Sequence, residues 1–312
     1  MSAEPSLQEL LEVQAHFGLP SPALVEKDFY VVKALAAIAA VDMEGLPLRL
    51  VFGGGTALSR AHRLVRRMSE DIDLRIVVDN NRSARGALRR LRTRVTEALL
   101  GAGFKFDPGD PAYRKSGNES RLTVYQLPYE PVTTGEGALR PTVQIETAAW
   151  PLRRPAVELP VISFMSEALQ RPPEIAGIAC VSILETAADK FVGLTRRADA
   201  ELAGLDEPDP TLVRHLHDLH VLREYYDPAE VAALAREVML ADAEAYGNQF
   251  PAYREDPMRE TLRAVEGLAA DPGYAQRYGE FQRLMVYGNK VEYEACVSTL
   301  RKLCGQVSSI IG

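Results

Sequence analysis

Three consecutive glycines, Gly53 to Gly55, constrain this chain of 312 residues more than any other feature of its sequence. They directly follow a short apolar segment, 48–52, and precede a segment, 56–64, whose apolar residues recur at spacings of three and four. The first pattern predicts a strand and the second a helix. Glycines at such a turn let the backbone approach a phosphate closely, and the following helix begins with unpaired N–H groups. The segment therefore predicts a triphosphate site, with an ordinary tight turn as the alternative.

The rest of the chain divides into a mixed first half and a helical second half. Strands are predicted where apolar and polar residues alternate, at 72–78, 104–106, 121–127 and 142–148. Apolar spacing predicts helices at 8–17 and 22–41 and a further helix ending at Gly101. After residue 160 the pattern becomes helical, with predicted starts at Ser182 and Asp209 and further helices at 228–247, 257–270 and 274–303.

Composition argues against a collagen-like, coiled-coil or disordered chain. Hydrophobic residues make up 46% of the chain and charged residues 25%, as in ordinary globular domains. The three cysteines form no C-x-x-C pair, so neither a disulfide framework nor a structural zinc site is indicated, and a cytoplasmic location is expected. The N-terminus lacks the pattern of a secretory signal, and no stretch approaches the roughly 18 apolar residues of a membrane span.

Charge is distributed unevenly along the sequence. The net charge is −7, which argues against a generally basic nucleic-acid-binding surface. Between residues 60 and 94, however, eleven arginines stand against four acidic residues, a local charge of +7, and the remainder of the chain therefore carries −14. Such a segment suits a phosphate-facing surface, and a solvated helix face is the alternative.

Two aspartates lie close behind the glycine turn. Asp71 and Asp73 are two residues apart at the start of a predicted strand, so both side chains point to the same face. Carboxylate oxygens, completed by phosphate oxygens, suit Mg²⁺, and two such ions stabilise the attacking and leaving oxygens of a displacement at phosphorus. Glu146 on a later predicted strand is the candidate third acid, with a structural salt bridge as the alternative.

Together these segments resemble the AbiEii/AbiGii-type nucleotidyltransferase toxins, which include the MenT-like toxins of toxin–antitoxin systems. The motif Gly-Gly-Thr-Ala-Leu matches 54–58, and Arg-x-Ser-Glu-Asp-Ile-Asp-Leu matches 67–74. Glu26-Lys27-Asp28 is also typical of the family. Downstream, Lys190 matches a helical lysine of the family and Asp218 an aspartate on a later helix.

The resemblance implies an α+β fold, with a nucleotidyltransferase domain at 1–165 containing a mixed, mostly antiparallel sheet and a helical domain at 166–312 that closes the active-site cleft. It implies catalytic roles for Asp71, Asp73, Lys190 and Asp218, with metal held by the two aspartates and Glu146. The metal is Mg²⁺, with two ions expected and Mn²⁺ as an alternative. The residues expected to contact the nucleotide are Gly54, Gly55, Thr56, Ser59, Arg67 and Ser69.

The resemblance also implies a reaction. An acceptor hydroxyl attacks the α-phosphate of an NTP, and the acceptor is the 3′ end of tRNA, so that translation is blocked. The implied partners are NTP, tRNA and a cognate antitoxin, with direct contact to the antitoxin left open and no membrane involved. Two alternatives stay open: transfer to a small hydroxylated molecule such as an aminoglycoside, and a catalytically silent nucleotide-binding protein. His215, His217 and His220 beside Asp218 leave a zinc cluster as a minor alternative.

Overall fold

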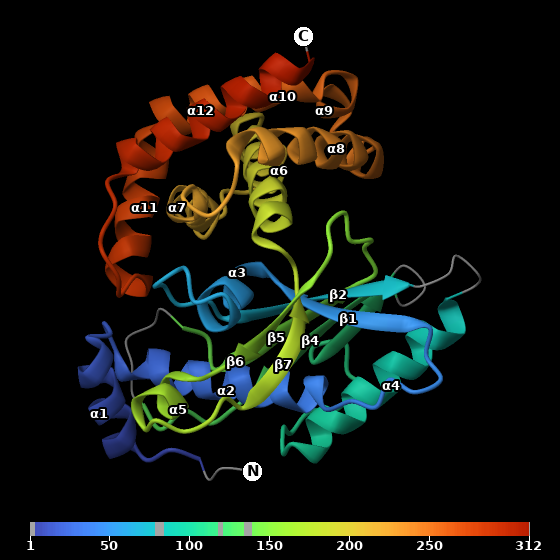
Figure 1. The fold of residues 1–312 in the computed structure, drawn as a ribbon, viewed down its shortest axis with the longest axis vertical. Coiled ribbons are helices and arrows are strands. Elements are labelled where there is room, and N and C mark those ends of the chain that lie inside the picture. The colour runs from blue at the N-terminus through green and yellow to red at the C-terminus, as the bar shows by residue number, and fades with distance from the viewer. Residues whose placement is uncertain (1–3, 79–83, 118–120, 134–138, 312) are drawn as a thin grey trace. The chain divides into compact units, whose positions relative to one another are not determined.

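The computed structural model describes residues 4–78, 84–117, 121–133 and 139–311 (Figure 1). The chain divides into two compact units, Met1–Val181 and Ser182–Gly312, each with its own hydrophobic core. The domain bounds predicted from the sequence, 1–165 and 166–312, remain a prediction. Residues 175–180 form a strand in the sheet of the first unit.

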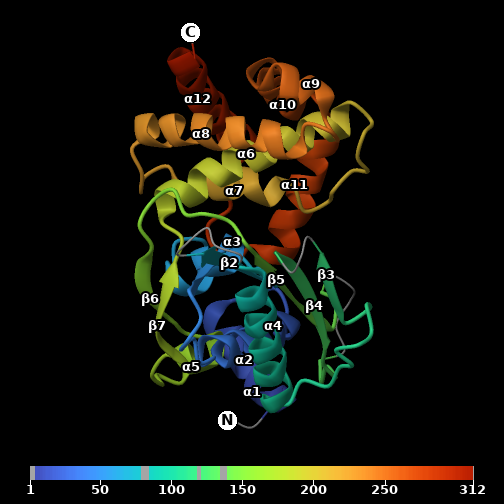
Figure 2. The same ribbon diagram turned by 90° about the vertical axis from the view of Figure 1, so that its right-hand side faces the viewer.

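The first unit is built on a mixed sheet with seven strands among its described residues (Figures 1 and 2). In sheet order these are β3 (Arg114–Gly117), β4 (Leu122–Pro128), β5 (Thr142–Ala148), β2 (Asp71–Val78), β1 (Leu48–Gly53), β7 (Ile175–Cys180) and β6 (Val157–Val161). The pairs β2 with β5 and β1 with β7 are parallel, and the other four neighbouring pairs are antiparallel. The predicted α+β class with a mixed, mostly antiparallel sheet is confirmed.

The helices of the first unit are α1 (Leu7–Phe17), α2 (Pro22–Ala39), α3 (Gly54–Thr56), the π-helical turn η1 (Ala57–Ala61), α4 (Arg85–Gly101) and α5 (Phe164–Ala168). Of these, α2, η1 and α4 share one hydrophobic core with the sheet. Apolar side chains of α2 and α4 pack with Ile72, Leu74 and Ile76 of β2 in this core. Because side chains alternate along a strand, Asp71 and Asp73 lie on the other face of the sheet.

Two predictions about strands are wrong. Residues 104–106 form no strand, although Phe104 and Phe106 are buried in the core, because apolar alternation reports burial and not hydrogen-bonded pairing. The expectation of helices after residue 160 missed β7, and β6 was not predicted from the sequence. Strand β7 contains two alanines and Gly177, which have low strand propensity, so its sequence carries a weak signal.

The second unit is helical, as predicted. Its helices are α6 (Ile183–Leu202), α7 (Val213–Leu222), α8 (Pro228–Tyr246), α9 (Pro251–Glu255), α10 (Pro257–Ala270), α11 (Pro272–Met285) and α12 (Tyr293–Ile311). The predicted continuous helix 274–303 is wrong, because the chain leaves helical conformation between α11 and α12, where Gly288 and Asn289 favour a turn. No helix in the described part of the chain is long and apolar enough to cross a membrane.

The start of α6 matches the sequence prediction. Ser182 is the N-cap residue, and its hydroxyl accepts a hydrogen bond from the backbone N–H of Glu185 at 3.3 Å. The helix predicted from Asp209 begins instead at Val213. The Asp209 carboxylate accepts hydrogen bonds from the backbone and hydroxyl of Thr211, so a turn precedes the helix.

Replacing Ser182 by Ala removes this cap, and we expect the free energy of unfolding to fall by about 1 kcal/mol. Denaturation in urea followed by circular dichroism measures the change. Ser309→Ala is the control, because that exposed hydroxyl lies near the end of α12, donates to the carbonyl of Gln306 and caps no helix start. An equal loss in both variants would contradict the capping role.

Candidate active site

The glycine turn lies against the aspartate strand. Gly53 pairs with Asp73 across the antiparallel strands β1 and β2. Gly54 has φ +69°, a left-handed conformation, and a Cβ atom there would overlap the Asp73 carboxylate. A Cβ on Gly55 would come within 2.5 Å of Nη2 of Arg67. The turn therefore needs glycine at both positions, because backbone, carboxylate and guanidinium are packed together there.

Two hydroxyl groups form hydrogen bonds around the glycine turn. Thr56 donates its Oγ1 hydrogen to the backbone carbonyl of Asp71, and Ser59 donates to the carbonyl of Thr56 at 3.2 Å. Both side chains are buried. Since these hydroxyl hydrogens are engaged by backbone carbonyls, the geometry gives the two residues a part in shaping the turn.

A buried cation lies directly behind the turn. The Arg67 side chain is only 1% exposed, and its Nη1 donates to the carbonyl of Met68 at 2.8 Å. Ser69 is also buried, and its Oγ would lie 2.7 Å from a Cβ on Gly55. The positive charge of Arg67 thus lies next to the backbone proposed to approach phosphate, where low dielectric strengthens electrostatic interactions.

Strand register brings the three predicted acids together. Asp73 pairs with both Gly53 of β1 and Glu146 of β5, and Asp71 pairs with Gln144. Asp71, Asp73 and Glu146 therefore lie on one face of two neighbouring parallel strands. Burial raises the pKa of Glu146 above its usual value, and the negative charges of Asp73 and Asp71 raise it further. The carboxylates are thus close enough to repel one another.

This set of donors fits magnesium. No group of three or more His, Cys, Asp or Glu side chains in the described ranges is already arranged to hold a metal ion. Mg²⁺ in proteins commonly takes one or two carboxylates and completes its shell with waters and substrate phosphates, so a ready-made cage is not required. Carboxylates that repel each other beside a glycine turn are suited to such an ion, because its charge removes the repulsion.

In the helical unit, Lys190 and Asp218 form a buried ion pair. Nζ of Lys190 on α6 lies 2.7 Å from Oδ2 of Asp218 on α7, and 3.4 Å from Nδ1 of His215. Burial, together with the positive charge of Lys190, holds the pKa of His215 well below its usual value of 6.5, so the ring is neutral. The contact with His215 was not predicted from the sequence, although a spacing of three residues places His215 on the same helix face as Asp218.

The three histidines of α7 have separate partners. His215 contacts Lys190, Nδ1 of His217 lies 3.2 Å from the Tyr278 hydroxyl, and Nδ1 of His220 lies 2.8 Å from Oγ1 of Thr299. Together with the absence of a metal-binding group among the described residues, these contacts give the zinc alternative no support.

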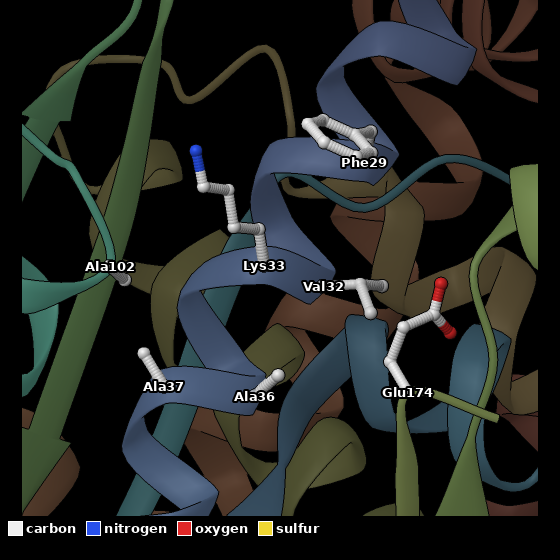
Figure 3. A pocket seen from close by; sticks show the side chains of 7 residues that line it. All are labelled: Phe29, Val32, Lys33, Ala36, Ala37, Ala102 and Glu174. Carbon is white, nitrogen blue, oxygen red and sulfur yellow. The ribbon is translucent and has the colours of Figure 1, made fainter. Parts of the chain in front are cut away.

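A cavity of about 340 Å³ lies elsewhere in the first unit (Figure 3). It runs beside α2, whose Lys33 borders it on one side, and Glu174 lies on another side. Glu174 accepts hydrogen bonds from Ser163 and Ser166, so its carboxylate stabilises the segment 163–166. None of the site residues predicted from the sequence is among the described residues that line this cavity.

Comparison with known proteins identifies the family. Residues 37–298 match the family described as nucleotidyl transferase AbiEii toxin of type IV toxin–antitoxin systems. The chain belongs to this family and is a nucleotidyltransferase toxin of that kind. Among solved structures, it is similar to MenT4, a nucleotidyltransferase toxin from Mycobacterium tuberculosis H37Rv, with 18% identity, a TM-score of 0.55, and coverage of 96% of this chain and 89% of that one. This likeness supports the fold. A search of curated proteins gives no significant match.

Gly54→Ala tests the close approach between the turn and Asp73. We expect a stability loss of about 1–2 kcal/mol from the left-handed backbone, together with a loss of nucleotidyl transfer of about 100-fold because the carboxylate is displaced. Gly45→Ala is a matched control, since its φ is +73° and nothing lies within 4 Å of an added Cβ. Measurement of unfolding and transfer in both variants separates the effects; equal loss of transfer would contradict the role of the contact.

Glu146→Gln tests the repulsion among the carboxylates. Because the folded-state pKa of Glu146 is raised, its ionised form opposes folding at neutral pH, and this cost disappears as the pH falls through that pKa. We expect the metal-free variant to melt higher than wild type at pH 7, by about 2–4 °C per kcal/mol relieved, with transfer activity reduced. The difference in melting temperature should vanish near pH 4. Glu97→Gln, on the exposed face of α4, should leave the melting temperature unchanged.

Proposed function

We propose that this protein transfers a nucleoside monophosphate from an NTP to the 3′-terminal hydroxyl of tRNA. The observation that carries the proposal is the placement of Asp71 and Asp73 on one strand face, opposite Glu146 and against the glycine turn. This arrangement provides carboxylates for divalent metal beside a backbone that admits phosphate. Family membership supports the reaction class.

Each group has a defined part in the proposed reaction. The backbone of Gly54 and Gly55 holds the phosphates, and Arg67 supplies positive charge behind them. Asp71 and Asp73, with Glu146, hold divalent metal, which supplies charge stabilisation to the phosphates when bound. The acceptor oxygen forms a bond to the α-phosphorus, the bond to the bridging oxygen breaks, pyrophosphate leaves and the acceptor loses its proton.

The resemblance to the family assigns Lys190 and Asp218 of the helical unit to the same reaction. Asp218 is fully buried and holds the Lys190 ammonium in one orientation, and the neutral ring of His215 adds a further polar contact. In this proposal Lys190 neutralises phosphate charge and Asp218 positions it. A buried, preoriented ammonium stabilises developing charge more effectively than a solvated one because it needs no reorganisation.

The basic segment supports an RNA acceptor. Of the arginines between residues 60 and 94, Arg60 and Arg67 are buried, whereas others in the described part of the segment are exposed: Arg63, Arg66, Arg85, Arg89 and Arg90. Exposed arginines on a folded unit suit an RNA backbone, because phosphate contacts supply most of the affinity for nucleic acids. As a toxin of a type IV system, the protein is proposed to be counteracted by a cognate antitoxin.

A second candidate acceptor is a small cationic molecule with hydroxyl groups, such as an aminoglycoside. The helical unit, residues 182–312, carries 22 acidic and 14 basic side chains, a net charge of −8, which would attract such a substrate. The same active centre would serve. The silent-binder alternative is the weakest, because the full set of carboxylates, glycines and the Lys190–Asp218 pair is present.

The test is to incubate the protein with Mg²⁺, each α-labelled NTP in turn and total tRNA, and to resolve the RNA on a denaturing gel. We expect label to enter tRNA with at least one NTP. Asp71→Ala and Asp73→Ala should each reduce labelling by at least about 1,000-fold, since each removes a metal-binding carboxylate. Both variants should retain the wild-type circular dichroism spectrum.

Other outcomes discriminate among the candidates. Persistent labelling in both alanine variants would overturn the metal assignment. Labelling of an aminoglycoside but not of tRNA would establish the second candidate. Nucleotide binding without transfer to either acceptor would indicate the silent binder.

A further inference from the structure

Three consecutive charged residues, Glu26, Lys27 and Asp28, are buried on helix α2, each with a side chain no more than 3% exposed. Each points to a different part of the first unit. Glu26 accepts hydrogen bonds from the backbone of residues 132 and 133, and Asp28 pairs with Arg60 at 2.8 Å and accepts from the backbone of Phe164. Burial of charge is costly unless each group is paired, so loss of one of these contacts lowers the stability of the unit.

Lys27 contacts both strands that carry the proposed metal ligands. Its Nζ lies 3.1 Å from the carboxylate of Glu70, the residue immediately before Asp71 at the start of β2. The same ammonium donates to the backbone carbonyl of Thr142, the first residue of β5, and to that of Arg140 at 2.8 Å. An ammonium has three hydrogens to donate, and here three acceptors surround it.

These contacts connect strands β2 and β5 at the strand ends nearest the proposed metal ligands. Strands β2 and β5 run parallel, with Asp71 beside Gln144 and Asp73 beside Glu146. Lys27 contacts the first residue of β5 and the residue preceding β2, so one side chain connects both strand starts. Asp73 and Glu146 lie side by side on these two strands, and their like charges repel each other.

We propose that Lys27 is a positioning residue, which fixes the spacing of Asp71 and Asp73 relative to Glu146 and thereby sets the affinity of the site for divalent metal. The inference rests on the proposed function only in assigning these three carboxylates to metal binding. It does not depend on which acceptor receives the nucleotide. In this proposal Lys27 acts through its contacts with the two strands.

Two variants remove the contacts between Lys27 and the two strands to different extents. Lys27→Met keeps most of the length of the side chain and loses both hydrogen bonds and the ion pair with Glu70. Glu70→Ala removes only the contact to the start of β2, and because Glu70 is 18% exposed this change leaves less buried polarity unpaired. Asp28→Asn is the matched control, since it removes a buried charge from the same helix but contacts Arg60 and Phe164 instead of β2 or β5.

The experiment measures binding of Mn²⁺ alone to the full chain. Electron paramagnetic resonance monitors the concentration of the free ion. We expect Lys27→Met to weaken Mn²⁺ binding by about 10-fold or more, as is common when a group that orients metal ligands is lost. Glu70→Ala should weaken it by a smaller factor, and Asp28→Asn should bind as wild type does. In transfer assays the Mg²⁺ concentration for half activation should rise in Lys27→Met, while the KM for NTP at saturating Mg²⁺ stays unchanged.

Each outcome has a meaning of its own. Wild-type Mn²⁺ affinity in both Lys27→Met and Glu70→Ala would overturn the inference, as would equal weakening in Asp28→Asn, which would indicate general loss of packing. If Lys27→Met does not fold, Glu70→Ala decides. Weakened Mn²⁺ binding in a protein that labels no tRNA would refute the proposed acceptor and leave the inference standing, whereas absence of Mn²⁺ binding by wild type would overturn both.

Discussion

The central constraint in this protein is that strand β2 is hydrogen-bonded on both sides, antiparallel to β1 and parallel to β5. This double pairing places Gly53, Asp73 and Glu146 in one row across three strands. Because side chains alternate along a strand, a slip by one residue would turn the aspartates toward the core and Ile72 toward the site. The apolar residues of β2 prevent such a slip, since they are buried against α2 and α4. The position of the site therefore depends on the packing of the opposite face of the sheet.

The fold brings the carboxylates of the site together although their negative charges repel one another. Three carboxylates lie on one face, and burial together with mutual repulsion raises the pKa of Glu146. Two buried cations lie near this negative region: Arg67 is next to the glycine turn, and Lys27 pairs with Glu70 beside the start of β2. The fold thus accepts a local cost in stability for a charge distribution that a divalent ion and a triphosphate complement, a trade common at functional sites. In the helical unit, the Lys190–Asp218 pair follows the same principle on a smaller scale, with one buried charge orienting another.

Sequence reasoning succeeded where a pattern reports local geometry. Alternation located β2 and β5 within one residue, and the capping pattern located the start of α6. It failed where tertiary pairing decides the outcome. Phe104 and Phe106 have the burial of strand residues but no strand partner, whereas β7 pairs with β1 despite a sequence of low strand propensity. Lys27 shows the same limit, because an apolar helix pattern does not reveal which strand ends a buried ammonium will contact.

The sequence by itself determined the chemistry: glycines at a strand-to-helix turn, two aspartates on one strand face, and the motifs that mark the nucleotidyltransferase toxin family. These are properties of residues close together along the chain, so short-range geometry is sufficient to predict them. Only the tertiary structure decided that Glu146 lies beside Asp73, that a Cβ on Gly54 would overlap the Asp73 carboxylate, and that Lys27 joins the starts of β2 and β5. Those contacts join residues up to 115 positions apart, and their geometry follows from strand register and core packing, which no local pattern encodes.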